Sequence, residues 1–222
     1  MKETCYFCDK QKTSDEHAPP RCIFPEQKDT GGKDYRKNLI TVPSCDAHNT
    51  NKCKDDEYLM MVLAAHYKNN QVAKNQTATK LFRSWKLNPE FAKKVVKNPR
   101  SIVIDGNVQV AFEIDNERFY RTLECIAHAL YFYNYNHRIR HAFKLIAVPL
   151  LSTSKDAQLV NAVRSKILID TNILFDKIAR LGENQEVFWY QLASEPEDRT
   201  VMRMCFYQGF QAVLMASPDL EI

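Results

Sequence analysis

Two pairs of metal-ligand residues constrain this chain more than any other feature of its sequence. Cys5 and Cys8 stand three positions apart near the N-terminus, and Cys45 and His48 repeat that spacing further on. Thiolate and imidazole ligands in two such pairs are typical of a closed tetrahedral zinc site, which stabilises a fold and does not catalyse. Residues 9–44 between the pairs are too many for a small zinc finger. The sequence therefore predicts that a structural zinc ion joins two loops around a larger insert.

Other cysteines compete for a place in this site. Cys22 lies within the insert and Cys53 follows the second pair, and either could replace His48 as a ligand. In the alternative without a metal, the cysteines are unconnected and buried as small apolar side chains. The chain has 7 cysteines, an odd number that does not fit a disulfide framework and favours a reducing compartment.

Composition excludes several classes of protein. Hydrophobic residues make up 45% of the 222-residue chain and charged residues 26%, which is typical of a folded globular protein. There are only 5 glycines, and neither glycine-rich phosphate-binding motif occurs. The polar start, MKETCYFCDK, does not resemble a signal peptide, and no apolar run is long enough for a membrane helix. We therefore expect a cytoplasmic protein with no membrane partner.

An acidic residue and a histidine stand side by side within the insert, as Glu16 and His17. Asn38 and a leucine precede the second ligand pair, and Asn49 directly follows its histidine. Over residues 5–60 this combination resembles the HNH endonucleases, a family with a ββα-metal fold. The resemblance implies that the acid–histidine pair ends the first strand and that Asn49 opens the helix.

The resemblance also implies roles for these residues. His17 resembles the general base, and Glu16 resembles the acidic ligand of a catalytic Mg²⁺ or Mn²⁺ ion. Asn38 resembles the middle asparagine that braces the loop, and Asn49 resembles the helix residue that shares this ion. The residue types suit the chemistry, because a neutral imidazole accepts a proton from water and carboxylate and amide oxygens bind hard cations. In the alternative, His17 is a structural histidine in a Pro-Pro loop.

The chain departs from the commonest HNH pattern at three positions. Glu16 stands where aspartate is more usual, His48 replaces a fourth cysteine, and Asn49 replaces the last histidine. The chain would thus have the H-N-N variant of the site. Each replacement keeps a suitable ligand, because glutamate and the asparagine carbonyl offer hard oxygen atoms and histidine is a common zinc ligand.

Basic residues gather between residues 66 and 100, where Glu90 is the only acidic residue. Such a surface suits a nucleic-acid backbone, and the alternative is an ordinary solvated helix face. Phe82 and Trp85 could stack on bases there. The candidate nucleic-acid-binding residues are Lys68, Lys74, Lys80, Arg83, Lys86, Lys93, Lys94 and Lys97. A second basic stretch, residues 134–141, could extend this surface or be a solvated helix end.

Hydrophobic patterns predict an α+β protein in three parts. We expect a small zinc-bound ββα-metal module over residues 1–60, a basic helical bridge over 61–100 and a larger mixed α+β domain over 101–222. The expected elements are a strand over 38–42, a helix from residue 55, a hairpin around 105–106, helices over 117–135 and 156–182, and strands within 143–151, 186–194 and 199–217.

Together these observations predict a metal-dependent HNH endonuclease that hydrolyses phosphodiester bonds in DNA. Analogy suggests a role in restriction or antiviral defence against phage. RNA stays open as a substrate, because such a site acts on phosphates. The alternative is a non-catalytic zinc-knuckle module that binds nucleic acid or a protein. A partner subunit or a homodimer, the sequence specificity and the role of residues 101–222 also stay open.

Overall fold

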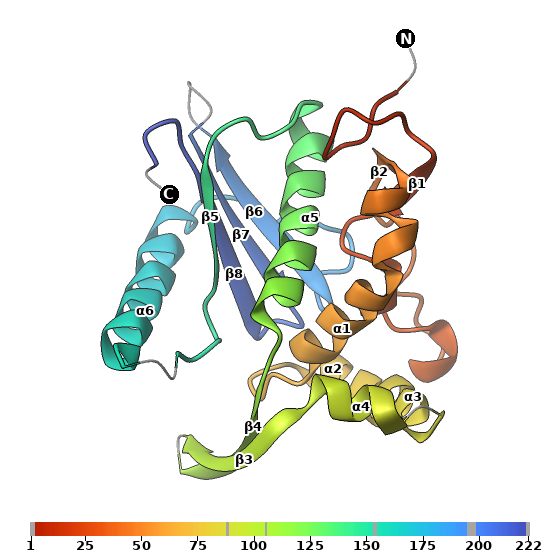
Figure 1. The fold of residues 1–222 in the computed structure, drawn as a ribbon, viewed down its shortest axis with the longest axis vertical. Coiled ribbons are helices and arrows are strands. Elements are labelled where there is room, and N and C mark those ends of the chain that lie inside the picture. The colour runs from red at the N-terminus through yellow and green to blue at the C-terminus, as the bar shows by residue number, and fades with distance from the viewer. Residues whose placement is uncertain (1–2, 88, 105, 153–154, 195–198, 221–222) are drawn as a thin grey trace.

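The computed structural model describes residues 3–87, 89–104, 106–152, 155–194 and 199–220 (Figure 1). Side chains are described throughout these ranges except at positions 91, 92 and 94. Helices and strands are mixed along the chain, which confirms the predicted α+β class. Among the described residues we find no helix with both the length and the apolar character that a membrane span requires.

A short hairpin and a helix form the N-terminal part of the fold. Strand β1 (Ser14–His17) pairs antiparallel with β2 (Thr41–Ser44), and helix α1 (Cys53–Ala64) follows. The predicted strand over 38–42 is displaced toward the C-terminus, because Asn38 has a φ of +53° and cannot continue an extended backbone. Short 3₁₀ turns connect these elements at Arg21–Ile23, Gln27–Asp29, Asp46–His48 and Thr50–Lys52.

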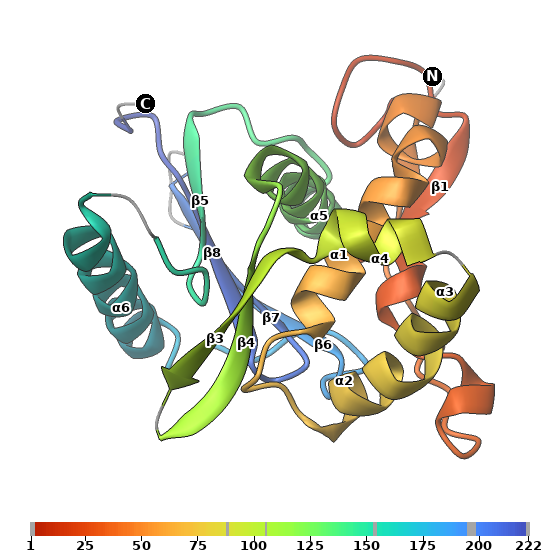
Figure 2. The same ribbon diagram turned by 60° about the horizontal axis from the view of Figure 1, so that its bottom comes forward.

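Residues 71–95 form a series of short helices. They are α2 (Gln71–Gln76), a π-helical turn (Thr77–Leu81), α3 (Phe82–Leu87) and α4 (Pro89–Val95). The side chain of Asn70 caps α2, because its oxygen accepts hydrogen bonds from the backbone N–H groups of Val72 and Ala73. The hairpin of β3 (Lys97–Ile104) and β4 (Asn107–Glu113) follows and projects from the body of the molecule (Figure 2).

The C-terminal part is a four-stranded antiparallel sheet with helices on both faces. Its strands, in the order β5-β8-β7-β6, are β5 (Phe143–Ala147), β8 (Phe210–Ala216), β7 (Thr200–Phe206) and β6 (Phe188–Ser194). Helices α1 and α5 (Asn116–Tyr135) lie on one face, and α6 (Ala157–Leu174) lies on the other (Figures 1 and 2).

The stretch 199–217, predicted as one strand, is the hairpin β7–β8, so that prediction was wrong. Its turn is hard to recognise, because Tyr207 and Gln208 both have positive φ, +49° and +60°, which such residues seldom adopt. Gly209 completes the turn, because any other residue at this position would place its Cβ atom only 2.6 Å from the backbone of Lys68. The hydroxyl of Tyr207 donates to the backbone oxygen of Ile23 at 2.6 Å and so joins the turn to the N-terminal part.

One hydrophobic core extends from Cys5 to Ala216. Leu59 and Leu63 of α1, Phe119 of α5 and Phe206 and Leu214 of the sheet are all buried in it. Apolar packing therefore crosses the boundaries at residues 60 and 100, and the three-part division stays a prediction about how the chain is organised.

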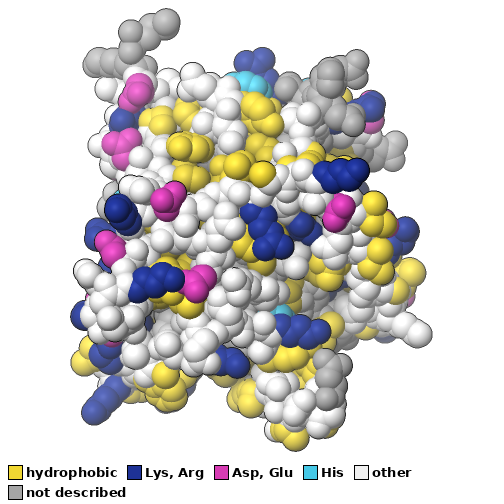
Figure 3. Space-filling model, turned by 180° about the vertical axis from the view of Figure 1, so that it is seen from behind, with side chains coloured by type: hydrophobic (Ala, Val, Ile, Leu, Met, Phe, Trp, Pro, Cys, Tyr) yellow, Lys and Arg dark blue, Asp and Glu magenta, His cyan; other side chains and the backbone are white. Residues whose placement is uncertain are grey.

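Hydrophobic side chains also reach the surface along α6 and on the β3–β4 hairpin. The most exposed include Leu159, Val163, Ile169, Ile173, Val103, Val108 and Val110. Viewed from behind, hydrophobic side chains line the flank where α6 lies, and Lys and Arg side chains are interspersed with Asp and Glu across the face (Figure 3).

Candidate metal centre and the adjoining strand

The four predicted zinc ligands lie together in the structure. Cys5 and Cys8 lie on the loop before β1, Cys45 directly follows β2, and His48 ends a 3₁₀ turn. The pairing of β1 with β2 brings the two loops together, and the backbone N–H of Tyr6 donates to the oxygen of Pro43 at 2.7 Å. All four ligand atoms lie within 4.8 Å of one another.

The distances within this Cys₃His group fit a tetrahedral ion. Nδ1 of His48 lies 3.6 Å from the Sγ atoms of Cys5 and Cys8 and 3.3 Å from that of Cys45. The Sγ atoms of Cys8 and Cys45 are 3.8 Å apart. Usual zinc bond lengths in a regular tetrahedron separate two sulfur ligands by about 3.8 Å, and sulfur from nitrogen by about 3.6 Å. The group could therefore bind a metal ion such as zinc.

Two of the ligands also have protonation behaviour that suits a metal. Burial raises the pKa of the Cys5 thiol, but hydrogen bonds from backbone N–H groups, that of Phe7 foremost, outweigh it and leave this pKa below its usual value. Burial, with the charges of Lys10 and Lys52, lowers the pKa of His48. These shifts favour thiolate at Cys5 and neutral imidazole at His48, the forms that bind metal, whereas burial raises the pKa of the Cys8 thiol.

Residues far along the chain support the first ligand loop. The guanidinium of Arg138 donates to the backbone oxygen of Cys5 at 3.1 Å and to Oγ1 of Thr4 at 2.9 Å, and it pairs with Asp9. The ring of Phe7 stacks on His48 with centroids 4.4 Å apart. The ring of Phe7 also packs against the ring of buried His128 on α5, with centroids 4.5 Å apart. Sequence reasoning missed Arg138 as a support of this loop, because Arg138 is distant in sequence from Thr4 and Cys5 and only the fold brings them together.

The rival ligands do not join the group. Cys53 is exposed at the start of α1, and Cys22 lies near Lys80 with burial raising its thiol pKa to about 12. Within the described ranges, Cys5, Cys8, Cys45 and His48 form the only group of three or more potential ligand side chains whose ligand atoms lie close enough together to hold a metal ion.

Glu16 does not lie free at the end of β1. Its carboxylate is buried, and Oε1 accepts a hydrogen bond from Nζ of Lys52 at 2.5 Å. The same ammonium group donates to Oδ1 of Asp56 at 2.7 Å. Burial, more than the opposing attraction of Lys52, raises the pKa of Glu16 to about 7 and that of Asp56 to about 6. Glu16 thus joins β1 to α1 through a buried ionic cluster.

His17 occupies the last position of β1, and its imidazole is half-buried. Neighbouring side chains of a strand point to opposite faces, so Glu16 faces α1 while His17 faces away from it. Burial lowers the pKa of His17, and the charge of Arg21 lowers it further against the opposing effect of Asp15. The imidazole is therefore neutral at neutral pH, the state that accepts a proton.

The two asparagines differ from each other in their contacts. Nδ2 of Asn49 donates to Oγ of Ser14 at 2.8 Å and to the backbone oxygen of Asp15 at 3.1 Å. Asn49 therefore braces β1 two residues before His17. Asn38, which the resemblance assigned to bracing, is exposed and has Nδ2 at 3.5 Å from Oε1 of Glu183.

The predicted basic residues do not form one uniform surface. Arg83 makes two hydrogen bonds to the carboxylate of Asp29, at 2.8 and 2.6 Å, and Lys93 pairs with Glu90 at 2.8 Å. Lys80 donates to the backbone oxygen of Cys22 at 3.0 Å. The remaining described members of the set are exposed, namely Lys68, Lys74, Lys86 and Lys97, whereas the side chain of Lys94 lies outside the description.

Comparisons with known proteins add no identification. No protein-family model, curated protein or solved structure matches this chain.

Proposed function

We propose that this chain is an endonuclease of the HNH type, braced by zinc, that hydrolyses phosphodiester bonds in DNA. The observation that carries the proposal is the β1–β2–α1 unit with its Cys₃His group. In this unit His17 lies at the end of β1, and Asn49, next to a metal ligand, holds the backbone of Asp15. A function in restriction or antiviral defence stays a prediction by analogy.

Zinc is the metal that we propose for the Cys₃His group, because the sulfur and nitrogen distances match its usual bond lengths. Its function would be structural, since four protein ligands complete a tetrahedron and leave no position for water or substrate. By joining the loop before β1 to the loop after β2, the ion would fix the positions of His17 and Asn49.

In the proposed reaction, the neutral imidazole of His17 takes a proton from a water molecule, and the resulting hydroxide attacks the phosphorus atom. The bond from phosphorus to the leaving 3′ oxygen then breaks, that oxygen takes a proton from water, and the imidazolium of His17 returns its proton to the solvent. Negative charge develops on the phosphate oxygens, and we propose Arg21, whose charge also lowers the pKa of His17, as the cation that would offset it.

A catalytic Mg²⁺ or Mn²⁺ ion fits less well than zinc does. The carboxylate of Glu16, its expected ligand, is buried against Lys52, whereas the hydrogen bonds of Asn49 to β1 use its amide nitrogen and not its oxygen. We derive no step from such an ion, and the dependence of cleavage on added divalent metal tests whether one takes part.

The test is nicking of supercoiled plasmid DNA, with and without Mg²⁺ or Mn²⁺. Changing His17→Ala should lower the rate by about 100-fold or more, because a positioned general base contributes that much. Zinc content and circular dichroism should not change. The control is Tyr133→Ala, an exposed aromatic residue on α5 outside the site and the basic stretches, which should keep full activity. Cleavage that survives in His17→Ala would show that His17 is not the base.

The burial of Glu16 against Lys52 favours a second candidate, a non-catalytic zinc module that binds nucleic acid. Under this candidate neither wild type nor His17→Ala cleaves DNA or RNA under any metal condition. Both would still retain DNA in a gel-shift assay, and His17→Ala would lower the free energy of unfolding.

A further inference from the structure

An arginine is buried on the face of the sheet that α6 covers, opposite to α1 and α5. Arg203 of β7 pairs with Gln191 of β6 and Val213 of β8 and is only 6% exposed. Its Nε donates to Oε1 of Gln191 at 2.9 Å, and Nη2 donates to the same oxygen. Its Nη1 donates to Oδ1 of Asn172 on α6. All these acceptors are neutral.

Within the described part of the chain, Arg203 has no carboxylate partner. Its guanidinium carbon lies 5.2 Å from the ring centre of Phe175 and 5.3 Å from that of Trp189. A second guanidinium, that of Arg180, lies 4.4 Å from the same Trp189 ring. Burial lowers the pKa of Arg203, and the charge of Arg180 lowers it further. Two cations therefore contact the Trp189 ring, and the buried one, Arg203, has no carboxylate partner among the described residues, which is costly for a buried charge.

The hydrogen-bonding capacity of Arg203 is also incompletely used. A guanidinium has five N–H groups, and the three hydrogen bonds above account for one on each nitrogen atom. One N–H group on Nη1 and one on Nη2 remain for another acceptor. An oxyanion with two oxygen atoms is the acceptor that a guanidinium binds best.

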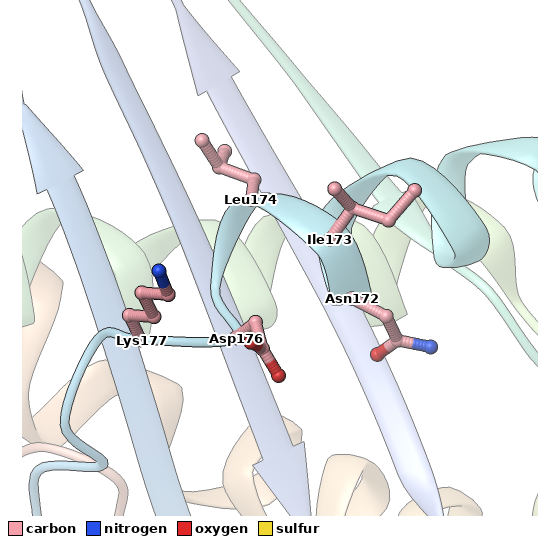
Figure 4. A pocket seen from close by; sticks show the side chains of 5 residues that line it. All are labelled: Asn172, Ile173, Leu174, Asp176 and Lys177. Carbon is pink, nitrogen blue, oxygen red and sulfur yellow. The ribbon is translucent and has the colours of Figure 1, made fainter.

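Asn172 connects this arginine to an open hollow at the end of α6. The hollow has a volume of about 550 Å³ and is lined by Asn172, Ile173, Leu174, Asp176 and Lys177. Figure 4 shows these side chains at the C-terminal end of α6, with the strands of the sheet behind them. The volume lies within the range of small-molecule sites. The lining contains one acidic and one basic residue, so its formal net charge is zero, and the excess positive charge beside it comes from Arg180 and Arg203.

We propose that this face of the sheet binds the oxyanion group, carboxylate or phosphate, of a small ligand. Arg203 and Arg180 would be its cationic partners, Trp189 would lie beside it, and Asn172 would contact the part of the ligand in the hollow. This site is independent of the proposed nuclease activity, because it includes no residue of the Cys₃His group, of β1 or of α1.

Tryptophan fluorescence can test the proposal, because the chain has only 2 tryptophans, Trp85 and Trp189. In a Trp85→Phe background, emission reports Trp189 alone. Inorganic phosphate and citrate are titrated separately, with sodium chloride added to hold the ionic strength constant. We expect a saturable change with at least one anion. Saturation by phosphate alone assigns a phosphate ligand, and saturation by citrate alone assigns a carboxylate.

Variants show whether the two arginines are responsible. In the same background, Arg203→Gln should weaken anion binding by about tenfold or more, as expected for a charge-assisted contact. Arg180→Gln changes an exposed side chain and should weaken binding by several-fold without affecting folding, so it decides the question if Arg203→Gln does not fold. The control is Arg100→Gln on β3, which should bind as before. The proposal is wrong if neither anion gives saturation, or if Arg180→Gln and Arg203→Gln bind like the control.

Discussion

The metal centre and the C-terminal sheet are held together by different kinds of contact. Around the Cys₃His group, a few directional interactions fix the chain: the contacts among the four candidate ligands, the hydrogen bonds of Arg138 and the ion pairs of Lys52. In the sheet, Met202, Met204 and Phe206 alternate along β7 and are fully buried beneath the helices. The first region therefore depends on single residues, whereas the second depends on the sum of many apolar contacts.

This difference predicts how each region responds to damage. Loss of one ligand of the proposed zinc site should remove the metal and with it the binding energy that would order both loops. Loss of one apolar side chain from the sheet removes only the contacts of that side chain, and the other strands remain paired. The most informative changes are therefore those that affect one region and leave the other intact.

The largest effect is expected from Cys45→Ser. The variant should lose the bound metal, about one zinc ion per chain in the wild type, because serine does not replace a thiolate ligand. Hydrogen-exchange mass spectrometry should then show loss of protection in residues 5–48, while β6, β7 and β8 keep most of theirs. Elemental analysis of the purified protein measures the metal directly.

The matched control is Cys53→Ser, since Cys53 is exposed and outside the Cys₃His group. It should keep both the metal and the wild-type exchange pattern. If Cys45→Ser lost protection equally in the sheet, the two regions would unfold as one unit. They would then differ in the kind of contact that holds them together but not in their response to damage. Wild-type protein without zinc would contradict the proposed metal.

A smaller effect is expected from Lys52→Met. The variant leaves the carboxylates of Glu16 and Asp56 buried without their shared cation, which typically costs about 3 to 5 kcal/mol. Urea unfolding measures this change in free energy. Lys54→Met, on the exposed side of α1, is the control and should change the free energy by less than about 0.5 kcal/mol. A similarly small change in Lys52→Met would mean that the buried ion pairs do not form in solution.

The same contrast explains what the sequence could and could not predict. The spacing of Cys5, Cys8, Cys45 and His48 was sufficient to predict that these side chains lie together, because structural zinc ligands typically occur in two closely spaced pairs along a chain. The partner of Glu16 was not predictable, since Lys52 reaches it only after β1 and α1 have packed together. Arg138 was missed for the same reason, as its contacts cross more than a hundred residues of sequence.

Beyond the metal centre, periodic patterns predicted the helices and strands more reliably than the turns. Alternating residues around Gly106 predicted the hairpin of β3 and β4, and apolar spacing predicted α5 with its buried Leu123 and Ile126. The β7–β8 turn was missed because Tyr207 and Gln208 adopt positive φ without the usual residue types. Tertiary packing of Tyr207 stabilises that turn, and such packing is not visible in a local pattern.

The smallest expected effect concerns pH and again separates the two regions. Burial raises the pKa of Glu16 to about 7 in the folded protein, whereas an unfolded glutamate titrates near 4.5. Between these values the folded state holds more protons than the unfolded state, so this group stabilises the fold most at low pH and the contribution is lost as pH rises through 7. With excess zinc present, the free energy of unfolding of the wild type relative to Glu16→Gln should fall by on the order of 1 kcal/mol between pH 6 and pH 8.

The comparison with Glu16→Gln isolates this group, because metal binding itself becomes stronger as pH rises and would hide the effect in wild type alone. Glu113→Gln, at the end of the exposed β4, is the control, and its free energy of unfolding should depend on pH as that of the wild type does. If Glu16→Gln showed the same pH dependence as wild type, the carboxylate of Glu16 would be ionised throughout this range. The attraction of Lys52 would then outweigh burial, and β1 and α1 would be joined by a full ion pair at every pH tested.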